Sequence, residues 1–292
     1  MITDFENLSE VGGIQEICLR HVQDAFGSQE LLEKEWQALR YSSCPHYEKA
    51  LKEYEALLKI FSDHKIKVHF YPSDPSLTID SIYVRDASIV TPYGVVLCAM
   101  GKPARACEPA VAKKFYHAHN IHVLGEIVGS GKIEGGDLVW LDRTHVAVAH
   151  SYRTNLEGIR QLQELLGKSV EIIVVPLPHY QGSGDVFHLM SILSPIDHDL
   201  LLVYSPLMPI VFREWLLAKG YHLVEVPEDE FLSMGCNVLA IAPRKALMIE
   251  GNPKTKHALE ACGTEVITIK GEEICHKGQG GPTCLTRPLF RA

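Results

Sequence analysis

Short apolar stretches and helical stretches follow one another along this chain in a repeated order. In each of four segments, a short apolar strand leads through a turn to a second strand, a helical stretch and a third strand. The segments begin at Ile82, Leu138, Phe187 and Asn237. Because the starting points are separated by similar lengths of chain, we interpret them as copies of one ββαβ unit.

The two ends of the chain together supply a fifth unit. Cys284 to Phe290 is its expected first strand, and Glu16 to Val22, the helix Tyr47 to Phe61 and the strand Val68 to Pro72 supply the rest. Sharing a unit between the termini removes the free edge of an open array. The sequence therefore predicts an α/β fold of five ββαβ units closed into a ring. Ser28 to Arg40 is an extra helix, and its function cannot be inferred from the sequence.

Composition narrows the class of protein. The chain has 292 residues, of which 46% are hydrophobic, so it can bury a large core. There is no linker or low-complexity stretch, and we expect residues 1–292 to form a single domain.

A net charge of −8 argues against a nucleic-acid surface or a membrane-surface helix. No apolar run approaches the roughly 18 residues of a membrane span. The amino terminus lacks the pattern of a signal peptide, so we expect a cytoplasmic protein that acts on a small molecule.

The cysteines and histidines give no metal pattern. The eight cysteines have no two-residue spacing of the kind that binds zinc, and a reducing cytosol would keep them as thiols. No pair of histidines at helical spacing accompanies a carboxylate. We therefore expect neither a metal nor another cofactor.

Reactive and charged side chains recur near the first strand of each unit. Equivalent positions of a pseudo-fivefold ring point toward the common axis, so residues far apart in sequence would meet there. The result would be a pocket with carboxylates, a histidine and a thiol. The residues at these places are Asp86, Glu134, Asp137, Asp185, His188, Cys236, Asn237 and Cys284.

Five separated motifs occur in an order that resembles one known family. They are Arg85-Asp86, Glu134-Gly135-Gly136-Asp137, SYRTN at 151–155, Phe187-His188-Leu189, and the run Gly280 to Cys284. The chain resembles the guanidino-group modifying superfamily over nearly its whole length. That superfamily has the five-bladed pentein fold, also called the α/β propeller. Its members include arginine deiminases, dimethylarginine dimethylaminohydrolases, arginine dihydrolases and arginine:glycine amidinotransferases.

The resemblance implies a catalytic group of three residues. Cys284 would be the nucleophile, exposed by the glycine-rich run before it. His188 would be the general acid and base, although the chain has 15 histidines and most of them must have other roles. Glu134 would fix and charge that histidine; the alternative is a simple turn acid between glycines.

The same resemblance implies the substrate contacts. Asp86 would bind the guanidinium, unless it merely pairs with Arg85. Arg105 and Arg153 would hold a substrate α-carboxylate, because a guanidinium fork suits that task. Asp137, either a strand cap or a pocket residue, and Asn237 are further candidates.

Met190 bears on which member of the superfamily this is. Deiminases and amidinotransferases that resemble this chain carry an acid two residues after the histidine, whereas this chain has Met190. Dimethylarginine hydrolases lack that acid and have a similar His-Leu-x-Ser step, but they place an acid where this chain has Arg85. We therefore expect a dimethylarginine-hydrolase-like enzyme that acts on arginine or an Nω-substituted arginine, with Met190 in the substrate pocket.

The alternatives are a deiminase or dihydrolase of arginine, an amidinotransferase, or a non-catalytic pentein such as a ribosome-binding factor. The leaving group and the oligomeric state, including a homodimer, stay open at this point.

Overall fold

Five separate three-stranded sheets make up the β structure of residues 9–292. The structure is a computed structural model that describes residues 9–292. In every sheet the middle strand pairs antiparallel with one neighbour and parallel with the other. Listed with the middle strand second, the sheets are β3 (Ser88–Thr91), β4 (Gly94–Leu97) and β5 (Val123–Glu126); β6 (Leu138–Trp140), β7 (His145–His150) and β8 (Glu171–Pro176); β9 (Leu193–Asp197), β10 (Leu200–Val203) and β11 (His222–Glu225); β12 (Leu239–Ala242), β13 (Lys245–Ile249) and β14 (Glu265–Ile269); and β15 (Arg287–Arg291), β1 (Ile14–Leu19) and β2 (Lys67–Phe70).

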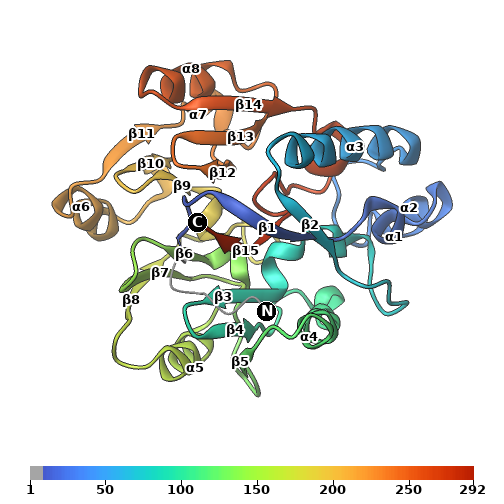
Figure 1. Cartoon of the computed structure of the whole chain (residues 1–292), viewed down its shortest axis with the longest axis horizontal. Coiled ribbons are helices and arrows are strands. Elements are labelled where there is room, and N and C mark those ends of the chain that lie inside the picture. The colour runs from blue at the N-terminus through green and yellow to red at the C-terminus, as the bar shows by residue number, and fades with distance from the viewer. Residues whose placement is uncertain (1–8) are drawn as a thin grey trace.

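A helix joins the second and third strands of each unit, because a parallel pair needs a long crossover connection. Figure 1 shows the five units around a common centre, with these helices on the outside of the ring. The arrangement confirms the predicted ring of five ββαβ units. The connecting helices are α4 (Glu108–Ala118), α5 (Leu156–Leu166), α6 (Ile210–Ala218), α8 (Pro253–Ala261) and α3 (Tyr47–Asp63), and shorter helices are α1 (Val22–Phe26), α2 (Gln29–Glu35) and α7 (Glu228–Phe231).

Helix α5 illustrates how the sequence specifies these elements. The Asn155 side chain caps its first turn by accepting a hydrogen bond from the Gly158 N–H. Its buried side chains include Ile159, Leu162 and Leu166, which share one helix face. The helix ends at Gly167, whose φ of 72° is accessible to glycine at little cost.

The ring closes where the two ends of the chain meet. Strand β15 pairs antiparallel with β1, with Ile17 opposite Pro288 and Cys18 opposite Arg287. Strand β1 then pairs parallel with β2. The predicted sharing of the fifth unit between the termini is confirmed.

The first strands of four units begin later than the sequence predicts, whereas β6 of the second unit begins at Leu138 as predicted. Val84–Ala87 and Leu189–Ser191 are 3₁₀ turns, and β15 begins at Arg287 rather than at Cys284. Polar side chains explain the difference, because they accept backbone N–H groups that a strand would use in its ladder. Asp137, for example, accepts from the Leu189 N–H at 3.1 Å, in the segment where a strand was predicted from Phe187. Most of the reactive residues therefore lie on turns just before the strands.

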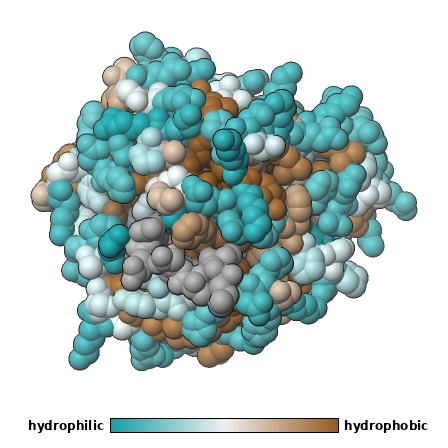
Figure 2. Space-filling view, viewed as in Figure 1, coloured by the Kyte–Doolittle hydropathy of each residue, from teal (hydrophilic) through white to brown (hydrophobic). Residues whose placement is uncertain are grey.

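The apolar core lies between neighbouring units. One buried cluster joins Ile17 and Leu57 of the fifth unit to Leu247 and Ile249 of the fourth. In Figure 2 hydrophilic residues cover most of the rim, and apolar residues appear mainly between them. Among residues 9–292, no helix has the length and hydrophobicity that a membrane span requires.

Candidate active site

A small cavity brings together residues from turns of four units. Cys284, His188 and Asp86 all line it, as do Arg105 and Arg153. The other lining residues are Leu39, Arg40, Asp80, Tyr83, Lys102, Val186, Gly278, Gln279 and Gly280. The thiol, the imidazole and the carboxylate that the sequence singled out therefore share one cavity.

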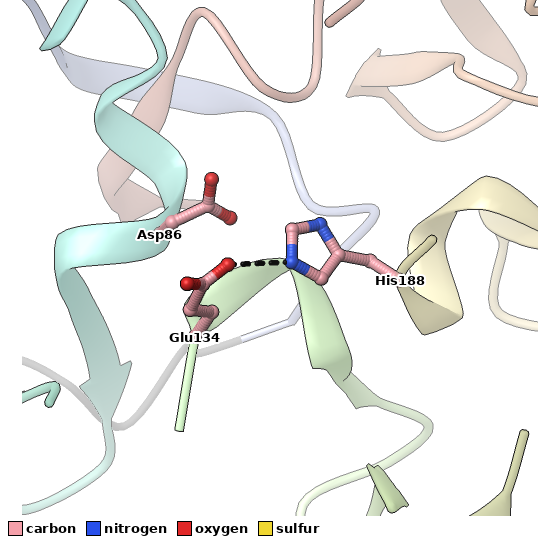
Figure 3. A group of neighbouring side chains, drawn as sticks. All are labelled: Asp86, Glu134 and His188. Carbon is pink, nitrogen blue, oxygen red and sulfur yellow. Dashed lines mark hydrogen bonds and ion pairs between the residues drawn. The ribbon is translucent and has the colours of Figure 1, made fainter. Parts of the chain in front are cut away.

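His188 and Glu134 form a buried pair at this cavity. His188 Nε2 lies 2.8 Å from Glu134 Oε2, the contact drawn as a dashed line in Figure 3. The Gly101 and Lys102 N–H groups donate to Glu134 Oε1 at 2.8 and 3.1 Å, and Arg153 Nη1 lies 3.0 Å from Oε2. Glu134 is fully buried. These contacts hold its carboxylate in one orientation toward the imidazole.

The charges around His188 keep it protonated. Burial alone would lower its pKa, but the carboxylates of Asp86, Asp137 and Glu134 outweigh burial and raise the pKa to about 9. For Glu134, burial is likewise outweighed, by the hydrogen bond and charge of His188 and by the charge of Arg153, so its pKa lies below the usual value. At neutral pH the pair is an imidazolium and a carboxylate.

Asp86 faces the same imidazole from another unit (Figure 3). Its Oδ2 accepts from Arg105 Nη1 at 2.6 Å, and its Oδ1 accepts from the Gly136 N–H at 3.0 Å. A Cβ atom on Gly136 would lie 2.7 Å from His188 Nδ1 and 2.8 Å from Asp86 Oδ1. Glycine is therefore required at position 136 for this approach.

Arg105 is largely occupied by protein partners. Its Nε and Nη2 donate to the two carboxylate oxygens of Glu108, both at 2.8 Å. Nη2 also donates to the Tyr83 carbonyl, and Nη1 donates to Asp86. Of the five guanidinium N–H groups, one on Nη1 remains for a substrate. Its one hydrogen bond to Asp86 orients that carboxylate, a role that the sequence did not reveal.

Arg153 has more unused donors. The hydrogen bonds of its side chain to described residues come from Nη1 and go to Glu134. Nε and Nη2 make none with residues 9–292, and the residue lines the cavity. Nε and Nη2 of Arg153 can therefore donate to a substrate carboxylate, the role that the sequence predicted.

Cys284 carries the thiol of the cavity. It is partly exposed, and Asn237 Nδ2 lies 3.2 Å from its Sγ. Asn237 Oδ1 in turn accepts from the Thr283 N–H, and a Cβ on Gly281 would approach it to 2.5 Å. The glycine-rich run therefore lets Asn237 reach the thiol. Burial, and after it the charge of Asp86, raise the pKa of the thiol to about 11, so it is neutral without a ligand.

Asp137 ties neighbouring turns together rather than lining the cavity. It is fully buried, accepts from Ser151 Oγ at 2.6 Å and accepts from the Leu189 N–H at 3.1 Å. It therefore fixes the turn that carries His188, and burial raises its pKa. The sequence left Asp137 as either a strand cap or a pocket residue. These contacts favour the cap, a structural role.

The structure places Met190 away from the cavity. Its side chain is 3% exposed and belongs to a buried cluster that includes Leu189, Phe187 and Leu193. The expectation that it lies in the substrate pocket is corrected, because the side chain packs in this cluster and does not line the cavity. Cys236 is also buried in that cluster.

Sequence reasoning missed several residues of the cavity. Leu39 and Arg40 come from the end of the extra segment Ser28 to Arg40, whose function could not be inferred from the sequence. Asp80 and Lys102 also line the cavity. Nothing in their local sequence separates them from ordinary surface residues.

Asp86, Glu134 and His188 are also close enough to suggest a cation site. Their ligand atoms all lie within 4.8 Å of one another. Both carboxylates, however, already have arginine partners, and His188 is cationic. A metal ion would have to displace these charges, so the donor set fits a metal poorly.

Comparison with known proteins identifies the relatives of the chain. A sequence model described as "N,N dimethylarginine dimethylhydrolase, eukaryotic" matches residues 28–291. This chain belongs to that family. An uncharacterized protein of Bacillus subtilis, YkgA, is 32% identical over 84% of this chain and 82% of its own length. The dimethylarginine dimethylaminohydrolase of Pseudomonas aeruginosa is 25% identical over 83% of this chain and 89% of its own length.

Solved structures of this superfamily share the fold. The Pseudomonas aeruginosa dimethylarginine dimethylaminohydrolase, solved with citrulline, has a TM-score of 0.76 at 23% identity and covers 94% of this chain and 98% of its own. An amidinotransferase of saxitoxin biosynthesis from Microseira wollei has a TM-score of 0.78 at 17% identity, covering 100% and 98%. The family member described here therefore has the pentein fold of the amidinotransferase superfamily.

Proposed function

We propose that this member of the dimethylarginine hydrolase family hydrolyses the guanidino group of arginine or an Nω-substituted arginine through a covalent adduct on Cys284. The observation that carries the proposal is the cavity in which Cys284, Asp86 and the His188–Glu134 pair meet. A delocalised guanidinium is a poor electrophile, so an enzyme must hold it rigidly and deliver a thiolate to it. These residues provide a carboxylate for the cation, a thiol and a proton donor.

Binding of the substrate would activate the thiol. Burial and the negative charge of Asp86 hold the thiol neutral in the free protein. A guanidinium bound at Asp86 offsets that charge and brings a cation close to Cys284, which lowers the pKa of the thiol. Deprotonation is thereby linked to the presence of the substrate.

The reaction would proceed through two displacements. The thiolate of Cys284 attacks the guanidinium carbon, and a new C–S bond forms. The C–N bond to the leaving amine then breaks, and His188 gives that amine its proton. The now neutral His188 takes a proton from water, which attacks the amidino-thioether. The C–S bond breaks, and a ureido product and the free thiol result. Glu134 stays ionised throughout and supports the cationic form of His188.

The sequence argument that favoured methylated arginines over plain arginine rested on Met190. Because Met190 lies in the core, that argument no longer separates a dimethylarginine hydrolase from a deiminase. The identity of the released amine distinguishes them, since plain arginine yields ammonia and methylated forms yield methylamines.

An assay of the products tests the proposal. The purified protein is incubated with arginine, mono- and dimethylarginine and agmatine, and ureido product, ammonia and methylamines are measured. We expect ureido product from the wild type and from the control Cys107→Ser, which changes another partly exposed cysteine. Cys284→Ser should form none. Equal turnover by Cys284→Ser would refute the covalent mechanism.

A further inference from the structure

An ammonium group of the protein already occupies part of the cavity wall. Lys102 Nζ lies 2.5 Å from Asp80 Oδ2 and donates to the Leu39 carbonyl at 2.9 Å. The side chains of Lys102 and Asp80 are only 16% and 5% exposed. All three residues line the same cavity as Cys284. This ion pair is therefore part of the space that a substrate enters.

The ion pair uses the acceptors that a substrate ammonium would need. An α-amino acid with a guanidino group brings a guanidinium at one end and both a carboxylate and an ammonium at the other. Of the described residues that line the cavity, only Asp80 and Asp86 carry carboxylates. Asp86 lies beside His188 and is the partner for the guanidinium. Asp80 is neutralised by Lys102, so a buried α-ammonium would find no free carboxylate.

The remaining charges of the cavity suit a carboxylate instead. Arg40, Lys102, Arg105 and Arg153 all line it. The guanidinium of Arg40 makes no hydrogen bond or ion pair with residues 9–292, and that of Arg153 has two unused nitrogens. Burial lowers the pKa of the Lys102 ammonium, Asp80 opposes this, and the charges of Arg105 and Arg153 lower the pKa further. A substrate carboxylate would reduce the repulsion among these cations, whereas an α-ammonium would increase it.

We propose that Lys102 selects against an α-ammonium, and that the preferred substrates are ω-guanidino carboxylates without that group. The inference rests on the proposed hydrolysis at Cys284, but as the preferred substrate it replaces arginine by guanidino carboxylates that lack the α-ammonium. The Lys102 ammonium takes the place that the α-ammonium of arginine would need, and the arginines bind the carboxylate. The product is then an ω-ureido carboxylate.

Two compounds that differ only in the α-ammonium test this proposal. Arginine and 5-guanidinopentanoate have the same chain, carboxylate and guanidinium. We expect kcat/KM of the wild type to be about ten-fold to a hundred-fold higher for 5-guanidinopentanoate, the range that a charged hydrogen bond can supply. Lys102→Met frees Asp80 and should shift the ratio toward arginine by a similar factor. Lys114→Met, which breaks an exposed ion pair with Asp74, should leave it unchanged.

The outcomes separate this inference from the proposed function. If the wild type forms no ureido product from any guanidino compound, the proposed function itself fails. If it forms ureido product but uses arginine at least as well as 5-guanidinopentanoate, Lys102 moves aside for the α-ammonium and the inference is wrong. The wild-type ratio decides this even if Lys102→Met does not fold. A ratio that favours 5-guanidinopentanoate but is unaffected by a folded Lys102→Met would also overturn the role of Lys102.

Discussion

Two adjacent residues, Arg85 and Asp86, belong to two buried charged clusters of different character. Asp86 contacts Arg105 and lines the cavity that holds the thiol. Arg85 pairs with Glu10 at 2.8 Å, beside Arg287 of the last strand. Both clusters contain buried guanidinium and carboxylate groups. They differ in that a nucleophile and a titrating imidazole adjoin only the first, so buried charge alone does not mark a catalytic site.

The second cluster instead connects the ends of the chain. Arg291 Nη1 donates to the Gly12 carbonyl at 2.7 Å and to the Ala240 carbonyl at 2.8 Å. Glu10 precedes β1 and Arg291 ends β15, so these contacts lie where the ring closes. Substitutions in the first cluster should therefore affect turnover, and substitutions in the second should affect stability.

The largest effect is expected at the imidazole of the first cluster. His188→Ala removes the proton donor and should lower kcat by about 10²- to 10⁴-fold. Glu134→Gln keeps the imidazole but removes the charge that supports it, and should cost less. Steady-state kinetics across pH, with circular dichroism as a check on folding, measures both. A pH–rate profile that neither change alters would contradict the assignment.

The second cluster should show the opposite pattern. Arg85→Met removes the direct ion-pair partner of Glu10 and should lower the free energy of unfolding by about 3–5 kcal/mol. Denaturant titration measures this, and the exposed pair of Lys59 and Asp63 supplies the control Lys59→Met, for which we expect little change. A stable Arg85→Met protein would mean that this cluster does not hold the ring closed.

The protonation of His188 predicts how stability depends on pH. Its folded-state pKa of about 9 lies above the ordinary value of 6.5, so the folded protein binds this proton more tightly than the unfolded chain does. The stabilisation is complete below pH 6.5 and is lost as pH rises toward 9. The stability advantage of the wild type over His188→Ala should therefore shrink across that window. An advantage that stays constant from pH 6 to about 9.5 would contradict the raised pKa.

The smallest effect is expected at Met190. Met190→Leu conserves volume in the core and should change the free energy of unfolding by less than about 1.5 kcal/mol. Because the side chain does not line the cavity, the ratio of kcat/KM for arginine and its methylated forms should stay the same. A shift in that ratio would mean that Met190 does contact the substrate.

These residues also show which features of the fold and the site can be predicted from the sequence. The repeat of strands and helices predicted the five units and their closure, because hydrophobic periodicity records which faces are buried. Residues in motifs, such as Cys284, His188 and Glu134, could be predicted to come together. Met190 was placed in the pocket and lies in the core, because its spacing from His188 does not show which side of the turn Leu189–Ser191 packs against the core. Asp80 and Lys102 were missed because their ion pair joins two separate turns, and the sequence around each residue shows no motif that indicates the pair.

The central claim is that Cys284 forms a covalent bond to the substrate carbon. Acid quenching of the wild type during turnover, followed by peptide mass spectrometry, tests it most directly. We expect the mass of the amidino adduct on the peptide that contains Cys284 and on no peptide with another cysteine. Turnover to ureido product without any adduct on Cys284, or with the adduct on a different cysteine, would contradict the account.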